Sequence, residues 1–172
     1  MLTRLALCFG FLLLPLQALA QAQEHELKAA YLYRFLTFIE WPAQPRAEGA
    51  ITIGVMGADD VLAELQEILP GRAIQGRPIA ARRVREGDSL AGLQMVFIGR
   101  AAPAATGKLP GVPGLVVVSD ADGALDRGAT VAFVRTEGRV RFQVSLEAAE
   151  RQGVRISSRM LSVAEQVRGR RL

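Results

Sequence analysis

The chain has 172 residues, of which 21 are basic and 17 acidic, and half of its residues are apolar. This composition is too apolar for a disordered protein, and the length fits one domain with a substantial core. With one cysteine, Cys8, and one histidine, His25, the chain lacks the residues for a disulfide framework or a cysteine-ligated zinc site.

Residues 1–20 have the three parts of a secretory signal peptide. Arg4 gives a positive start, an apolar run follows to Leu16, and Ala18-Leu19-Ala20 has the A-x-A pattern of a cleavage site. The apolar run is shorter than the roughly 20 residues that span a bilayer, which argues against the alternative, an N-terminal membrane anchor. We therefore expect export, cleavage near Gln21 and a mature domain over residues 21–172 without cysteine.

The mature chain carries only a small positive charge. Residues 1–20 contain one charged residue, Arg4, so their removal leaves 20 basic and 17 acidic residues, a net charge of +3. Much of this surplus lies in the run Arg168-Gly169-Arg170-Arg171, which we interpret as a solvated chain end. We expect no nucleic-acid partner.

Residues 26–40 predict an amphipathic helix, which Pro42 ends because proline disfavours helical geometry in the preceding residue. Lys28 falls within the apolar arc, and we expect its stem to cover the core while its amine reaches water. Five aromatic residues lie within residues 31–41, and most should belong to the core. Tyr33 lies on the polar side of the helix and Trp41 lies past its end. Both are candidates for exposed contacts with a protein partner.

The next segments alternate between strands and helices. Residues 51–56 predict a buried strand, and a helix follows that Asp59 or Asp60 caps and Pro70-Gly71 ends. The pattern then predicts an arginine-rich strand near a sheet edge at residues 78–84. Two central strands follow at residues 95–98 and 115–118, with a short helix between them at residues 101–109.

The C-terminal third predicts a hairpin and two helices. Apolar residues alternate on both sides of Glu137-Gly138, which indicates a β-hairpin over residues 130–145. Ser145 caps a short helix that Gly153 ends, residues 154–156 are extended, and residues 160–167 predict a last amphipathic helix. The whole pattern predicts an α/β fold, one domain with a mixed β-sheet flanked by helices, a C-terminal hairpin and a terminal helix.

No catalytic motif is complete. His25 lies near the mature N-terminus, on an end expected to be mobile, and no G-x-S-x-G sequence is present. Asp120, Asp122 and Asp126 resemble the opening of a calcium loop, but Val131 stands where its bidentate glutamate belongs, so turn formation explains them better. Tight turn geometry likewise explains Gly54 and Gly57 better than nucleotide binding. We expect no enzyme, no cofactor and no metal site.

Several short motifs follow one another in an order that resembles the YfiR family. They are Lys28-Ala29-Ala30-Tyr31-Leu32-Tyr33, Trp41-Pro42, Gly76-Arg77-Pro78-Ile79, Val96-Phe97-Ile98, Val117-Val118-Ser119-Asp120, Arg141-Phe142, Ala148-Ala149 and Gly153-Val154-Arg155-Ile156-Ser157-Ser158-Arg159-Met160-Leu161. The resemblance covers about residues 26–167. It implies a non-enzymatic periplasmic α/β protein that often forms homodimers.

The resemblance also implies a function. Such a protein holds an inner-membrane diguanylate cyclase inactive by binding its periplasmic sensory domain, which lowers cyclic di-GMP, and an outer-membrane lipoprotein can draw it away. Well-known members carry disulfide-forming cysteines, which the mature chain here lacks.

We predict that Tyr33, Trp41, Arg155 and Arg159 contact the partner. The alternative for the two arginines is structural: Ser157-Ser158 caps a helix and the flanking arginines are solvated. A second functional hypothesis is a small-ligand sensor or carrier with a cleft at the strand ends near Gly57 and Asp120.

Overall fold

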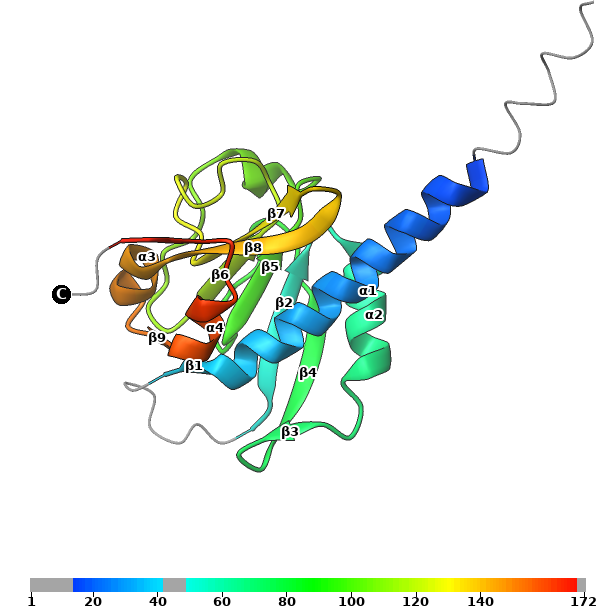
Figure 1. Ribbon diagram of the computed structural model, residues 1–172. Helices are drawn as coiled ribbons and strands as arrows, with labels where there is room; N and C mark the ends of the chain where they lie inside the picture. Colours follow the sequence, from blue (N-terminus) through cyan, green and yellow to red (C-terminus); the bar gives the residue numbers. More distant parts are fainter. Residues whose placement is uncertain (1–13, 42–48, 170–172) are drawn as a thin grey trace, which may run out of the picture.

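A mixed sheet of eight strands forms the centre of the molecule (Figure 1). The structure is a computed structural model, and it describes residues 14–41 and 49–169. Its elements are α1 (Leu14–Phe38), β1 (Ile39–Glu40), β2 (Ile51–Met56), α2 (Asp59–Ile68), β3 (Ala73–Ile74), β4 (Arg77–Arg83), β5 (Met95–Ile98), η1 (Pro103–Thr106), β6 (Val116–Ser119), β7 (Val131–Thr136), β8 (Arg139–Ser145), α3 (Leu146–Arg151), β9 (Arg155–Ile156), α4 (Ser158–Ser162) and β10 (Gln166–Arg168).

The strands follow the order β10-β8-β7-β6-β5-β2-β4-β3, and β1 pairs with β9 in a separate antiparallel ribbon. The five strands from β7 to β4 in this order are mutually parallel, whereas β8 runs antiparallel to β7. The predicted α/β class and mixed sheet are therefore confirmed. The arginine-rich strand β4 lies next to the sheet edge, as predicted, with only the two-residue β3 outside it.

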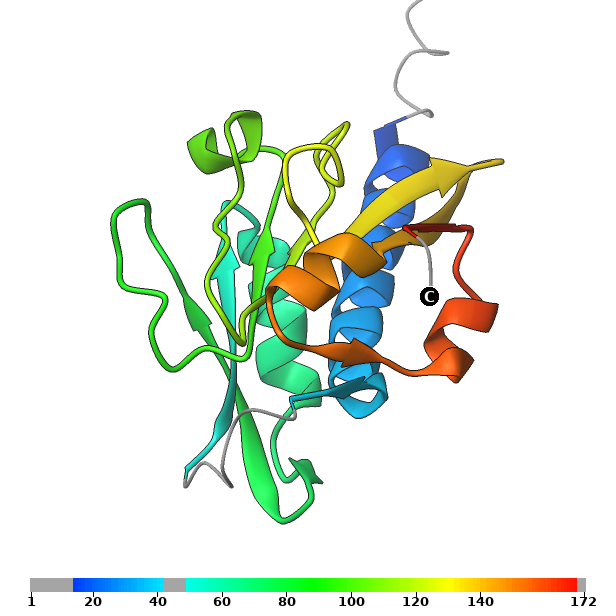
Figure 2. The ribbon, with the colours of Figure 1, turned by 90° about the vertical axis from the view of Figure 1, so that its left-hand side faces the viewer.

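The central strands are buried on both faces because the sheet separates two apolar layers. Phe97 and Val118 belong to the layer that contains the buried residues of α1 and α2, whereas Val96 and Val117 belong to the opposite layer. Figure 2 shows α1 and α2 on one side of the sheet and η1 with its neighbouring loops on the other. This arrangement explains why β5 and β6 are continuous apolar runs.

Helix α1 packs its aromatic side chains against the core. The Phe35 ring lies 4.9 Å from that of Phe142 and 5.9 Å from that of Phe133, between ring centroids. Tyr31 lies 5.5 Å from Phe142. Such pairs contribute roughly 0.5–1.5 kcal/mol each beyond their buried area, and here they hold α1 against β7 and β8. The prediction that most of this aromatic segment belongs to the core holds in part: Phe35 is buried in the core, whereas the other four aromatic residues are partly buried and pack against it.

The helix begins before the predicted residue 26. Residues 14–20 continue α1 and project beyond the sheet (Figure 1), while residues 1–13 lie outside the described residues. The predicted signal peptide over residues 1–20 and its cleavage near Gln21 stay predictions. At its other end α1 gives way to β1, because Ile39 and Glu40 pair with Ile156 and Arg155.

The predicted hairpin and two serine caps are confirmed. Strands β7 and β8 join through Glu137 and Gly138, whose φ angles of 51° and 74° are those of a two-residue hairpin turn. The Ser145 hydroxyl accepts a hydrogen bond from the Ala148 amide at 3.1 Å and begins α3. Ser157 accepts from the Met160 amide in the same way and begins α4.

The predicted cap of α2 is wrong. Its N-cap residue is Ala58, and Asp59 and Asp60 lie in the first turn, where negative charge favours the helix dipole. Asp59 binds Arg83 instead, with Oδ2 and Nη1 2.7 Å apart. No side chain caps α2, and the turn before it depends instead on Gly57, whose φ is +64°.

The predicted terminal helix is wrong beyond Ser162. Val163 is 65% exposed, and the chain turns so that Gln166–Arg168 pairs in parallel with the outer edge of β8. An open edge of β8 would leave backbone groups without partners, and β10 supplies them, which a short helix cannot do. Arg168 binds Asp126 at 2.6 Å, whereas Arg170 and Arg171, predicted to belong to the solvated end, lie outside the described residues.

Candidate functional site

The carboxyl ends of β2, β5, β6 and β7 meet at one edge of the sheet, because these strands are parallel and adjacent. From β2 the chain crosses to β4, which lies on one side of β2 in the sheet. It then crosses back to the other side of β2 and continues through β5, β6 and β7. Between β2 and β5 the connections therefore diverge. Ligands of open α/β sheets bind in the crevice at such a point.

Two glycines allow the turns at this point to approach each other. At Gly57 φ is +64°, and a Cβ there would lie 2.7 Å from the backbone nitrogen of Ala102. At Gly99 a Cβ would lie 2.5 Å from the carbonyl oxygen of Gly57. The turns after β2 and β5 thus depend on glycine for space. The turn role predicted for Gly54 is wrong, because Gly54 lies within β2. A Cβ there would lie 2.7 Å from the Leu93 and Val84 side chains, so packing requires glycine.

A cleft of about 380 Å³ opens at these strand ends, between the sheet and α1. We call it the strand-end cleft, and its polar lining consists mainly of Glu24, His25, Lys28, Arg100, Asp120 and Arg135. The prediction of a cleft near Gly57 and Asp120 is confirmed, since both residues line it.

Lys28 pairs with two of the carboxylates that line the strand-end cleft. Its Nζ lies 2.6 Å from Oδ2 of Asp120 and 2.6 Å from Oε1 of Glu24, and its side chain is 5% exposed. The expectation that its amine reaches water is wrong, because two carboxylates occupy the region into which the amine points. Asp120 also accepts a hydrogen bond from the Arg100 amide at 2.6 Å, which anchors the loop after β5.

Glu24 joins this network to the hairpin. Its Oε2 lies 3.2 Å from Nη2 of Arg135, which belongs to β7. Burial alone would raise the pKa of Glu24, but the hydrogen bond from Lys28 and the positive charges of Lys28, Arg135 and Arg100 outweigh burial and hold that pKa below its ordinary value. The network is an ionic clamp between α1 and the strand ends.

His25 is half-buried within α1, and the expectation of a mobile end is wrong. Its Nδ1 lies 3.6 Å from Oδ2 of Asp60. The described residues that line the cleft include no serine, threonine or cysteine for this histidine to activate. Within residues 14–41 and 49–169 no group of three or more His, Cys, Asp or Glu side chains is placed to hold a metal ion.

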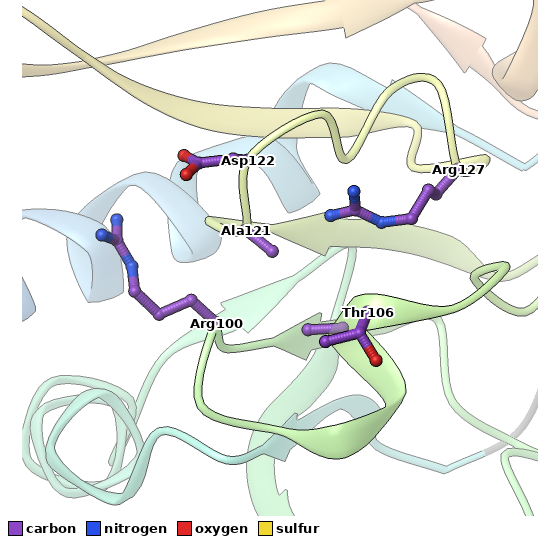
Figure 3. Close-up of a pocket in the computed structure, with 6 residues that line it drawn as sticks. Arg100, Thr106, Ala121, Asp122 and Arg127 are labelled. Atoms are coloured by element: carbon purple, nitrogen blue, oxygen red, sulfur yellow. The ribbon is translucent and has the colours of Figure 1, made fainter.

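A second pocket, of about 340 Å³, lies beside the strand-end cleft (Figure 3). The loops after β5 and β6 form it. Its lining residues are Arg100, Ala105, Thr106, Ala121, Asp122 and Arg127, and we call it the arginine pocket. Arg100 also lines the strand-end cleft, so the two spaces are neighbours.

A profile of the YfiR/HmsC-like family matches residues 25–165, which include all of the strands described above except β10. The chain belongs to the YfiR/HmsC-like family. No curated protein matches the chain significantly. The YfiR/HmsC-like family is a regulatory, non-catalytic family of diguanylate cyclase pathways. In the described part of this chain, no helix combines the length and the apolar composition that crossing a bilayer requires.

Three of the four partner-contact residues predicted for this YfiR/HmsC-like protein lie at the same end of the molecule. Trp41 follows β1, and Arg155 pairs with Glu40 in the β1–β9 ribbon, so these two lie at one end of the molecule. Arg159 belongs to α4, which follows β9 directly, and both arginines are exposed (Figure 1). Trp41 is half-buried, and its Nε1 donates a hydrogen bond to the Gly114 carbonyl at 2.8 Å.

Tyr33 lies apart from the other three. It is half-buried, its ring packs against the main core, and the guanidinium of Arg72 lies 4.6 Å above the ring centroid. Arg72 belongs to the connection between α2 and β3, so Tyr33 has intramolecular contacts on this side of α1. A contact role for the four residues stays a prediction.

Proposed function

We propose that this protein is a non-enzymatic periplasmic regulator that binds and inhibits the sensory domain of an inner-membrane diguanylate cyclase. The match of the YfiR/HmsC-like family over residues 25–165 carries this proposal. It is supported by the cleft chemistry, in which the charged side chains pair with one another instead of activating a nucleophile. Inhibition requires tighter binding to the inactive conformation of the receptor than to the active one.

The proposed contact surface is the end of the molecule that carries Trp41, Arg155 and Arg159. The β1–β9 ribbon ties the end of α1 to the segment before α4 and so brings Trp41 and the two arginines to one end of the molecule. Arginine and tryptophan are the residue types that most often dominate the energy of protein interfaces. Export through the signal peptide, homodimer formation and release by an outer-membrane lipoprotein belong to the same proposal.

Deletion of the gene and measurement of cellular cyclic di-GMP test the function. We expect the level to rise, and to fall again when the full chain is restored but not when a chain without residues 1–20 is supplied. An unchanged level under several growth conditions would contradict the proposal.

A pull-down from membranes tests the surface. We expect Trp41→Ala and the double variant Arg155→Ala/Arg159→Ala to recover less of the cyclase than the native chain does. Arg139→Ala is the control for the arginines, because Arg139 is also exposed and lies on the hairpin away from this end. Equal recovery by all variants would exclude this surface as the contact.

A second candidate function is the sensing or carriage of a small ligand, which the strand-end cleft beside Gly57 and Asp120 favours. Its volume of about 380 Å³ lies in the range of small-molecule sites. A thermal-shift screen with periplasmic metabolites tests it, because a ligand that binds the folded state raises the melting temperature. If no metabolite raises it, this candidate is excluded.

A further inference from the structure

Arg127 stands out among the described residues by a buried side-chain nitrogen that has no hydrogen-bond partner. Among the described residues that are not exposed, its Nε is the single buried side-chain nitrogen or oxygen with no hydrogen bond. Buried donors are almost always satisfied, and an exception calls for a specific explanation. A guanidinium donates five hydrogen bonds and accepts none, so what this group lacks is an acceptor.

The carboxylates near Arg127 are engaged elsewhere or turned away. Asp126 binds Arg168 at 2.6 Å, and Asp120 binds Lys28 at 2.6 Å. Asp122 lines the same pocket but forms no ion pair with Arg127 within the described residues. In Figure 3 the guanidinium of Arg127 points toward the other residues of the arginine pocket, whereas Arg100 stands at the opposite edge with its guanidinium directed away from Arg127.

We propose that the arginine pocket binds a small anion that carries a phosphate or carboxylate group. The guanidinium of Arg127 has no ion pair within the described residues, and its two terminal nitrogens donate to the oxygens of the anion, in a planar geometry that matches both kinds of oxyanion. Arg100 supplies a second positive charge, since its side chain is 64% exposed and its Nε lies a long 3.6 Å from Asp120. The volume of about 340 Å³ holds a small organic anion.

The pocket is built on anchored segments. The Arg100 amide donates to Oδ1 of Asp120 at 2.6 Å, and the Leu109 amide donates to the Arg127 carbonyl at 2.9 Å. These bonds fix the two loops that carry the arginines, so an anion finds its donors in place and little entropy is lost on binding. The inference does not rest on the proposed regulatory function, because the pocket is distinct from the surface around Trp41.

Titration of the full-length mature chain with inorganic phosphate and, separately, with succinate tests the proposal. Sodium chloride at matched ionic strength is the control for screening. The first measurement is the NMR signal of the Arg127 Nε–H group in the unaltered protein, which we expect to shift and saturate with at least one of the two anions. The second is the melting temperature, which the bound anion raises.

Variants locate the site. Arg127→Gln is expected to weaken binding about tenfold or more, because charge-assisted hydrogen bonds are lost. Arg127→Lys keeps the positive charge but not the planar guanidinium, so its affinity for the anion should lie between those of the native chain and Arg127→Gln. Arg135→Gln, which alters only the strand-end cleft, and Arg139→Gln, which removes an exposed charge from the hairpin, should bind as the native chain does.

The outcomes separate cleanly. A response to phosphate alone identifies a phosphate-bearing ligand, and a response to succinate alone identifies a carboxylate. A response to both identifies an oxyanion site of broad selectivity. Each of these three results supports the proposal. It is overturned if chloride has the same effect, if Arg135→Gln abolishes binding while Arg127→Gln does not, or if the Arg127 Nε–H signal stays unmoved. The NMR titration decides the question even if Arg127→Gln fails to fold.

Discussion

Nζ of Lys28 lies 2.6 Å from Oδ2 of Asp120, and the two residues are 92 positions apart in the chain. Both side chains are almost fully buried, at 5% and 8% exposure. The pair joins α1 to the end of β6, at the edge of the sheet where the strand-end cleft opens. Glu24, one turn before Lys28 and 17% exposed, binds the same amine and completes a triad of charged side chains.

Replacement of Lys28 by methionine should strongly destabilise the fold. The variant keeps the apolar stem but removes the amine that Asp120 and Glu24 share. Glu24 keeps its contact with Arg135, whereas Asp120 keeps only the long 3.6 Å contact with Arg100. Breaking a buried pair costs about 3–5 kcal/mol. Urea denaturation monitored by circular dichroism measures the loss. In the double variant Lys28→Met/Asp120→Asn part of the stability should return, because the buried charge is removed as well. A loss below about 1 kcal/mol for the single variant would mean that the triad is hydrated and weak.

The ionic clamp should weaken in acid. The pKa of Glu24 is held below its ordinary 4.5, so folding favours the ionised carboxyl. The stability that this preference provides is fully present above the pKa of the unfolded state, and it is lost as the pH falls through the lower pKa of the folded state. The difference in unfolding free energy between the native chain and Glu24→Gln should therefore shrink from pH 6 to pH 3. A difference that stays constant over this range would contradict the assigned pKa direction.

Gly57 should be far less tolerant of alanine than Gly71. Both residues have positive φ, +64° and +75°, which costs an alanine roughly 1–2 kcal/mol. At Gly57 the new Cβ would also lie 2.7 Å from the Ala102 nitrogen, whereas at Gly71 no atom lies within 4 Å. Equilibrium unfolding of the two variants isolates the steric part. Equal losses would show that the turn after β2 relaxes freely.

Local patterns were sufficient for much of the fold. Several features depend only on residues close in sequence. They are the period of α1, the apolar runs of β5 and β6, the turn at Glu137-Gly138 and the caps at Ser145 and Ser157. The terminal helix failed because its final residues pair with β8, and the edge of a distant strand leaves no trace in a short apolar pattern.

The site was harder to predict for the same reason. From the sequence alone, a lysine in the apolar arc of a helix can be either buried or exposed at its amine. The burial of Lys28 is explained only by the fold, which brings Asp120 to its amine. The signal that was present is a charged residue in the core face of one helix together with an aspartate directly after a buried strand. Arg127 gave no such signal, because its isolation depends on Asp126 turning to Arg168.

Removal of residues 165–172 should open the edge of β8 without unfolding the core. The deletion takes away the pairing of Gln166–Arg168 with Gln143–Ser145, and also the hydrogen bond from the Glu165 amide to the Phe142 carbonyl. Strand β8 remains paired with β7 on its other side, so hydrogen exchange should accelerate in α3 and at the outer end of β8 and stay slow in β5 and β6. Deletion of residues 170–172 alone is the matched control, because it leaves β10 intact. If both deletions exchange alike, β10 contributes no protection in solution, and the edge of β8 must be covered by other means.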